Sequence, residues 1–187
     1  MSRLKNPWVM TRQQVKDVLQ ITVVDYDALI DQYLPIVSAD IEKITNNTFV
    51  ISRTGDFTDA SATVSGVVTK RLDFGDVVSY ADFEQVEIVD IDDEHEQIVV
   101  DASATGDSTD ADFLVNIFPR AKKPIAAQMV LYNIKKYTSD QTNFAGPLAS
   151  ETVGSYSWTA ADGGKGGAGY PAAIVNTLKE ITRPRVH

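Results

Sequence analysis

Hydrophobic positions between residues 11 and 49 recur every three to four residues and predict two consecutive helices. Thr11 followed by Gln14 is a capping-box pattern that favours the start of the first helix. The β-branched run 21–24 favours its end, and Asp25 is then a good N-cap for the second helix. The apolar side chains that define the buried face of the second helix are Leu29, Ile30, Tyr33, Leu34, Val37, Ile41 and Ile44.

Pro35 lies inside the apolar pattern of the second helix. Proline lacks a backbone N–H and crowds the carbonyl of Asp31, so we expect a kink or a broken turn there. Asn46 and Asn47 are expected to end the helix, because asparagine tolerates the left-handed conformation that is common at helix ends.

The pattern changes between residues 50 and 118, where Val, Thr, Ile and Phe alternate with Gly, Asp and Ser, a composition that predicts short strands and turns. The strand candidates are 85–92, 97–101 and 112–118, with a charged turn at 92–96. Alternation in the first candidate places Val86, Ile88 and Asp90 on one face and Glu87, Val89 and Ile91 on the other. We interpret the region as a small antiparallel sheet inserted between helices.

Helical periodicity resumes at Pro124, a favourable first-turn residue, and is expected to end at Lys135 and Lys136. Residues 162–169 have the composition of a flexible linker, and 171–182 form an amphipathic helix. The expected fold class is α+β: mainly an α-helical bundle with an inserted small antiparallel β-sheet subdomain and an extended C-terminal helical arm. The expected parts are N-terminal bundle helices (1–49), an acidic β-rich insertion (50–118), a third bundle helix and loop (119–149), and a Gly-rich linker with a C-terminal arm (150–187).

Charge is distributed unevenly along the chain, whose net charge is −9. Residues 50–118 hold 16 acidic and three basic side chains, a net charge of −13, whereas the remainder is net positive. The absence of cysteine excludes disulfides and thiolate metal sites. No apolar run approaches the roughly 20 residues of a membrane span, and the N-terminal sequence MSRLKNPW lacks a signal-peptide core, so we expect a soluble, unsecreted protein.

Motifs for catalysis or ligand binding are weak. Residues 164–169 match GxGxxG, but no hydrophobic strand precedes them, which argues against a dinucleotide site. The acidic stretch 90–101 has His95 and Asp101 where a calcium loop requires Gly and Glu, so a solvated hairpin tip is favoured, although weak calcium or magnesium binding stays open. His95 and His187 have no partners at the spacing of a catalytic triad or a zinc site. We therefore predict no catalytic, metal or cofactor-binding residues.

Two segments carry a resemblance to a known family. The pattern TxxxVKxxLxI followed by LIxxYLPxVSxxIExxTNxTF, within residues 11–49, resembles the head-tail connector (adaptor) proteins of tailed bacteriophages. SETVGSYSW, at 150–158, is similar to the S-E-x-x-G-x-Y-S segment found late in such chains, and the helix at the end of the chain fits the same order. The resemblance covers both helical ends of the chain and little of the acidic region.

This resemblance implies a structural adaptor that forms a ring, usually of twelve copies, under the portal and links the DNA-filled capsid to the tail. The implied partners are the portal protein, a downstream stopper or tail protein, and further copies of the chain. DNA would pass through the channel without specific binding, and no membrane, cofactor or enzymatic activity is implied. The implied location is the neck of the virion, after assembly in the host cytoplasm.

The C-terminal segment is the expected portal-docking arm, because a flexible linker precedes a short amphipathic helix and a basic tail. The expected portal interface consists of Tyr170, Ile174, Leu178, Ile181, Arg183, Arg185 and His187. Tyr156 and Trp158 are candidates for a subunit interface, with core packing an equal alternative. The alternative for the helix itself is packing on the bundle of its own subunit.

Two other functions stay open at this point. The chain could be a stopper or tail-completion ring, which binds the adaptor instead of the portal. More remotely, it could be a small ligand-binding module or enzyme built on the inserted sheet, although no nucleophile, base or metal set converges there. The acidic segment could line the DNA channel or face outward, and outward placement is favoured because insertions usually decorate the periphery.

Overall fold

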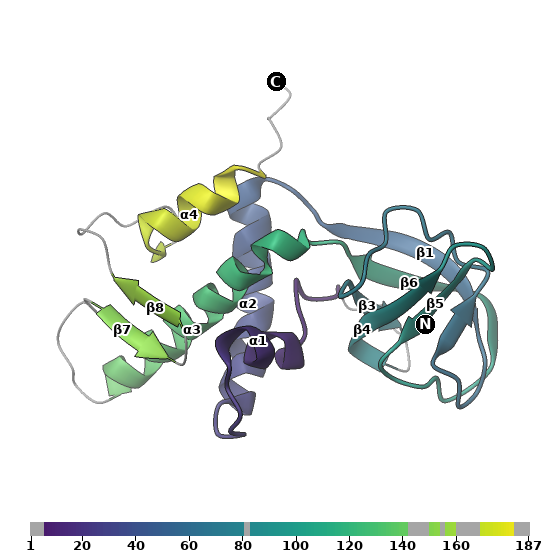
Figure 1. Cartoon of the computed structure of the whole chain (residues 1–187), viewed down its shortest axis with the longest axis horizontal. Helices are drawn as coiled ribbons and strands as arrows, with labels where there is room; N and C mark the ends of the chain where they lie inside the picture. Colours follow the sequence, from purple (N-terminus) through teal and green to yellow (C-terminus); the bar gives the residue numbers. More distant parts are fainter. Residues whose placement is uncertain (1–5, 81–82, 142–149, 154–155, 160–168, 182–187) are drawn as a thin grey trace. The chain divides into compact units, whose positions relative to one another are not determined.

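The computed structural model describes residues 6–80, 83–141, 150–153, 156–159 and 169–181, which belong to two compact units (Figure 1). One unit, here called the barrel unit, comprises Met1–Thr11 and Phe49–Arg120. The other, the helical unit, comprises Arg12–Thr48 and Ala121–His187. The barrel unit is therefore built mainly from one continuous stretch, whereas the helical unit is assembled from both ends of the chain.

Six antiparallel strands of the barrel unit close into a barrel in the order β1-β2-β5-β4-β3-β6 (Figure 1). The strands are β1 Val50–Phe57, β2 Thr63–Ser65, β3 Val77–Tyr80, β4 Phe83–Asp92, β5 Gln97–Val100 and β6 Ser108–Asn116. Closure depends on the ladder between β1 and β6, in which Val50 lies opposite Asn116 and Arg53 opposite Phe113. This ladder gives the first and last strands a partner on both sides, so the sheet has no exposed edge.

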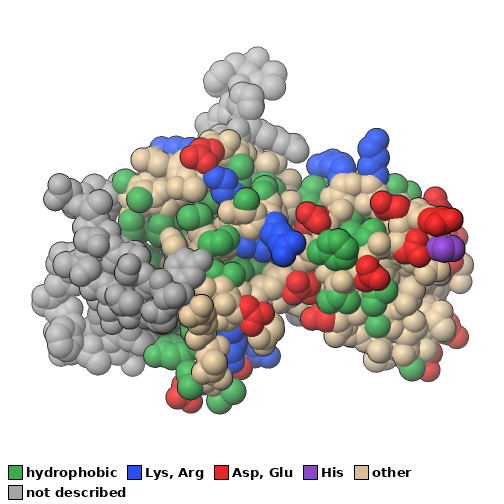
Figure 2. All heavy atoms as spheres, viewed as in Figure 1, with side chains coloured by type: hydrophobic (Ala, Val, Ile, Leu, Met, Phe, Trp, Pro, Cys, Tyr) green, Lys and Arg blue, Asp and Glu red, His purple; other side chains and the backbone are tan. Residues whose placement is uncertain are grey.

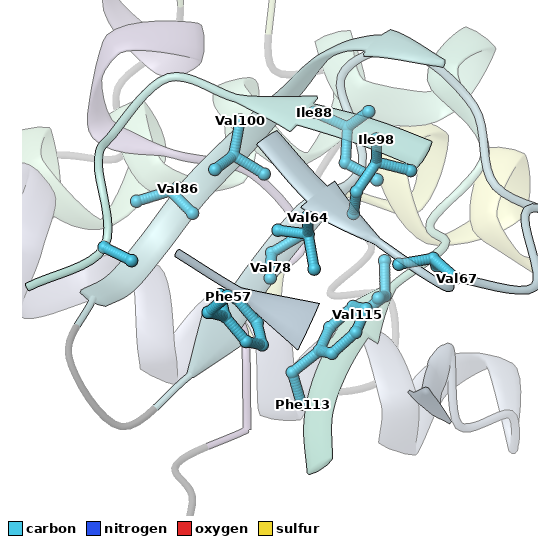
Figure 3. Packing of buried hydrophobic residues seen from close by; sticks show 11 residues of the cluster. Phe57, Val64, Val67, Val78, Val86, Ile88, Ile98, Val100, Phe113 and Val115 are labelled. Carbon is cyan, nitrogen blue, oxygen red and sulfur yellow. The ribbon is translucent and has the colours of Figure 1, made fainter. Parts of the chain in front are cut away.

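The barrel encloses its own hydrophobic core (Figure 3). The ring of Phe57 stacks on that of Tyr80 at 3.9 Å and meets the ring of Phe113 edge to face at 5.7 Å. Val and Ile side chains from all six strands fill the remainder, as expected for strands that alternate inward and outward positions. The buried members of this core are Phe57, Val64, Val67, Val78, Val86, Ile88, Ile98, Val100, Ala104, Phe113 and Val115.

A β-bulge changes the predicted faces of β4. The register shifts between Ile88 and Asp90, so the residues beyond the bulge exchange faces. Ile91 packs against the barrel core, whereas Val89 is 49% exposed and Asp90 is exposed as well. Simple alternation had grouped Asp90 with Val86 and Ile88, and that grouping is wrong because it ignores the extra residue.

The helical unit contains four α-helices and a two-stranded hairpin among the residues that the structure describes. The elements are α1 Arg12–Leu19, α2 Asp27–Thr45, α3 Lys123–Gln141 and α4 Ala172–Lys179, with the short 3-10 turn η1 Arg120–Lys122 before α3 and the hairpin β7 Ser150–Val153 and β8 Tyr156–Thr159. Helix α3 contacts α1, α2 and α4. Apolar stripes from these helices form a second core, which includes Leu34 and Ile41 of α2, Met129 and Ile134 of α3, and Leu178 of α4.

Helix α2 ends at Asn46 as the sequence predicts, whereas two other expectations for this helix need correction. Asn46 has the left-handed conformation expected of a C-cap, at φ 48° and ψ 38°. The second helix begins after Tyr26, which makes no side-chain cap, so the predicted N-cap role of Asp25 is wrong. Helix α2 also continues through Pro35 without a broken turn. Packing of its apolar face offsets the loss of one backbone hydrogen bond.

The predicted fold class was wrong. The chain is not mainly a helical bundle with a small inserted sheet, because the acidic region closes into a six-stranded barrel with a core of its own. The three expected strands correspond to β4, β5 and β6, but β1, β2 and β3 complete the barrel. The C-terminal helix is not an extended arm either, since α4 packs on α2 and α3.

Candidate interaction surfaces

The corner between α1 and α2 has a fixed geometry. A Schellman-type end closes α1: Gln20 has φ 56°, its N–H donates to the carbonyl of Asp17, and the N–H of Ile21 donates to the carbonyl of Lys16. Lys16 Nζ then reaches Asp27 Oδ1 of α2 at 2.7 Å. A second ion pair joins Arg12 to Asp31 of α2. These contacts connect the corner to the first turns of α2.

The outer side of this corner is apolar. We name Val23, Val24 and Tyr26 the corner patch; Val24 is 71% exposed, and the other two are also exposed. Single exposed apolar residues are common, but three within four positions of one rigid turn are typical of a surface that a partner covers. The sequence contained the signal in its β-branched run, which predicted only the end of a helix.

The expected docking helix, α4, uses its apolar stripe inside the helical unit. Leu178 and Val175 are completely or almost completely buried, and Ile174 and Ile181 are partly buried. The Lys122 ammonium also forms an ion pair with Glu180 just after α4. This is the arrangement of the alternative in which the helix packs on its own subunit, so Leu178 is not free to enter a groove of a partner.

Tyr170, just before α4, is buried and is held by a partly buried polar cluster. Its hydroxyl donates to Asp40 Oδ2 of α2 at 2.8 Å and accepts from Asn133 Nδ2 of α3 at 2.9 Å. Burial raises the pKa of the Tyr170 hydroxyl well above its usual value, and the neighbouring Asp40 carboxylate raises it further. The hydroxyl therefore stays protonated and links the start of α4 to both long helices.

The remaining predicted interface residues are only partly placed. Arg183, Arg185 and His187 lie outside the described residues. Tyr156 and Trp158 lie on β8, opposite Val153 and Glu151 of β7, and their side chains are likewise outside the description.

The acidic tip between β4 and β5 is a turn organised by one carboxylate. Asp92 Oδ1 accepts from the backbone N–H groups of Glu94 and His95, and Asp92 Oδ2 lies 2.8 Å from His95 Nδ1. The hydrogen bond from the His95 side chain lowers the pKa of the Asp92 carboxyl. Among the described residues, no group of three or more His, Asp or Glu side chains is arranged to hold a metal ion.

Comparisons with known proteins give no family for the chain: no protein-family model matches it, and no curated protein does. Within the described part of the chain, no helix has the length and apolar character required to cross a membrane.

Proposed function

We propose that the protein is a structural head-tail adaptor of a tailed bacteriophage, a ring subunit that docks under the portal and links the capsid to the tail. The observation that carries the proposal is the resemblance of residues 11–49 and 150–158 to that family. These segments correspond to α1, the corner and α2, and to the β7–β8 hairpin. The ring, usually of twelve copies, is part of the same proposal.

The corner patch supports an assembly function. Binding surfaces need exposed apolar area held in a defined shape, and Val23, Val24 and Tyr26 provide it on a turn fixed by ion pairs. We assign the portal contact to the corner patch and to the basic tail Arg183, Arg185 and His187, because Tyr170 and Leu178 are already buried within the helical unit. Ile174 and Ile181 retain partly exposed area that can extend the contact.

The test is reconstitution. The purified protein is mixed in turn with portal, stopper and tail components of a matched phage, and the complexes are weighed by native mass spectrometry. A complex with portal supports the adaptor, and a complex with a separate adaptor but not with portal would assign the chain to the stopper class. Binding to none of these components would overturn the proposal.

A matched pair of variants tests the assignment of the portal contact to the corner patch. Val24→Asp places a charge in the corner patch and is expected to weaken portal binding at least about fivefold, because the loss of a central apolar contact costs about 1 kcal/mol or more. Thr22→Asp adds the same charge at an exposed polar position of the same turn and is expected to retain binding. Equal effects of both substitutions would show that charge near the corner, and not its apolar surface, governs binding.

A further inference from the structure

The exposed side of α2 is uncharged over most of its length. Its exposed residues recur every three or four positions and are Ala28, Gln32, Pro35, Ile36 and Ala39, which we name the outer face. The next exposed charged residue is Lys43, one turn beyond Ala39. A surface helix normally carries charged side chains on the side that faces water, so this composition is unusual for a solvated face.

The opposite side of α2 belongs to the core of the helical unit. Ile30, Leu34, Val37 and Ile41 are all 0% exposed. A helix that lacks charged side chains both on its buried side and on its exposed side is typical of one that is covered all round. By contrast, acidic side chains are spread over the barrel face visible in Figure 2. The helical unit covers one side of α2, and the outer face is left for a partner.

The polar groups beside the outer face define the chemistry of that partner. Asp31, at the border of the face, uses its carboxylate in the ion pair with Arg12 of α1, at 2.8 Å. Pro35 has no N–H to donate to the carbonyl of Asp31, so this carbonyl can accept a hydrogen bond from a partner. The Gln32 amide can donate and accept. A neutral hydrogen-bonding side chain among apolar ones fits this surface, whereas a charged one would lose its hydration without gaining an opposite charge.

The outer face adjoins the corner patch at the start of α2. Ala28 follows Tyr26 by two residues. Among the residues that the structure describes, seven large hydrophobic side chains are exposed, and four of them belong to these two surfaces: Val23, Val24, Tyr26 and Ile36. Figure 2 shows hydrophobic side chains at the tip formed by the corner, at the bottom of the view. Exposed apolar area is therefore concentrated along the corner and α2, as at a surface that a partner covers.

The shape of the outer face suits a second helix. At about 1.5 Å of rise per residue, the face is about 16 Å long. Ala28, Gln32 and Ile36 form a ridge at four-residue spacing, and ridges of this kind fit into the grooves of another helix. Ala28 and Ala39 have short side chains, so a partner helix can approach α2 closely at both ends of the face.

We propose that a helix of the portal protein lies along the outer face of α2 and continues the contact made by the corner patch. The partner helix presents apolar side chains together with a neutral hydrogen-bond donor for the carbonyl of Asp31. The inference rests on the proposed function, because it names the element of the same partner that binds beside the corner patch. It adds a second contact surface and excludes charged side chains from the centre of the partner helix.

The first test uses single introduced thiols, because the chain contains no cysteine. Ile36→Cys is treated with a thiol reagent in the presence and absence of the portal protein of a matched phage, and modification of the chain is followed by mass spectrometry. Portal should slow the modification of I36C and leave that of V89C, in the barrel unit, unchanged. A photoactivatable cross-linker on Gln32→Cys should join portal residues that recur every three or four positions, the spacing of one side of a helix.

The second test compares the affinities of variants for the same portal protein. Ile36→Glu places a charge at the centre of the outer face and should weaken binding about fivefold or more. Ala39→Trp adds bulk without charge and should also weaken it, because the partner helix can no longer approach closely. Val89→Glu is the matched control and should bind like the wild type, since Val89 is 49% exposed and Ile36 is 46% exposed. Circular dichroism checks that each variant is folded, and Ile36→Ser replaces I36E if that variant unfolds.

Three results would overturn the proposal. In the first, the wild type binds portal and the outer-face variants bind equally well, which removes this contact and leaves the adaptor function in place. In the second, V89E weakens binding as much as I36E, so that added charge anywhere on the chain has the same effect. In the third, I36C is protected at high protein concentration without portal, which assigns the outer face to a second copy. A wild-type chain that does not bind portal would overturn the adaptor function together with this contact.

Discussion

The barrel unit and the helical unit reach a stable core by different routes. The barrel closes a mostly continuous stretch, Phe49–Arg120, through main-chain ladders and encloses a core of apolar side chains. The helical unit is built from both ends of the chain, and hydrogen bonds between polar side chains link its segments. Tyr170 binds Asp40 and Asn133, and the Lys123 ammonium donates to the Gln14 side chain. The stability of the barrel should therefore depend on the shape of its interior. The stability of the helical unit should depend both on its core and on the attachment of its last segment, α4.

The largest effect is expected for Phe113→Ala, which tests whether the barrel core is independent of the helical unit. Phe113 is fully buried in the barrel core, so we expect a loss of about 3–5 kcal/mol in the free energy of unfolding. Hydrogen exchange should report loss of amide protection in β1 to β6 while α2 and α3 keep theirs, because the two cores consist of different residues. Leu114→Ala, at the partly buried neighbouring position, is the control with a smaller expected effect. Equal loss of protection in α2 and α3 would mean that the units unfold as one.

Leu178→Ala is the counterpart in the helical unit. Leu178 is fully buried on α4, and its truncation is expected to cost about 2–5 kcal/mol. Amide protection of α4 should be lost first, with weaker protection in α2 and α3, while the barrel strands are unaffected. Asn176→Ala, on the exposed side of the same helix, should leave protection unchanged. A stable helical unit in L178A would contradict this prediction and indicate that α4 contributes little to the stability of its own subunit.

The sequence predicted the local features of both units and missed the non-local ones. The apolar spacing in α2, the left-handed Asn46 and the strand β5 depend on neighbours in the chain, so a pattern of a few residues specifies them. Barrel closure depends on pairing Val50 with Asn116, at opposite ends of the acidic region, and no local pattern encodes that pairing. The short β2 and β3 were also hidden by their Gly-rich and Asp-rich flanks.

The candidate surfaces likewise combine local features that the sequence shows with contacts that only the fold shows. The amphipathic stripe of α4 was visible in the sequence, but the choice between a partner and its own subunit depended on tertiary contacts with α2 and α3. The corner patch was likewise present as a β-branched run, and only the fold distinguishes exposed Val24 from buried Val15. Arg53 of β1 lies against the connection between β2 and β3 only in the fold, where its side chain donates to the carbonyls of Val68 and Lys70.

Gly55→Ala tests how strongly the stability of the barrel depends on the shape of its interior. A Cβ at Gly55 would lie 2.8 Å from Val64 Cγ1 and 2.9 Å from Val67 Cγ2, closer than carbon atoms tolerate. Overpacking of this kind is expected to cost about 1–3 kcal/mol, measured as a lower midpoint in urea unfolding. Gly106→Ala is the matched control, because apart from Gly106 and its two chain neighbours no atom lies within 4 Å of the Cβ position. An unchanged midpoint for Gly55→Ala would indicate that β1 shifts freely and that the barrel is less tightly packed than the helical unit.

The smallest effect is expected at the exposed turn between β4 and β5, which belongs to neither hydrophobic core. The Asp92 carboxyl has its pKa lowered from 3.8, first by the hydrogen bond from the His95 side chain. A lowered pKa in the folded state means that this interaction stabilises the turn above the unfolded pKa and is lost as pH falls through the folded value. His95→Ala should raise the pKa of Asp92, measured by NMR titration of its carboxyl carbon. The rise should be incomplete, because the backbone N–H groups of Glu94 and residue 95 still donate to Asp92 Oδ1. An unchanged pKa would assign the whole shift to those backbone donors, so the turn would owe its order to the main chain, as the barrel does.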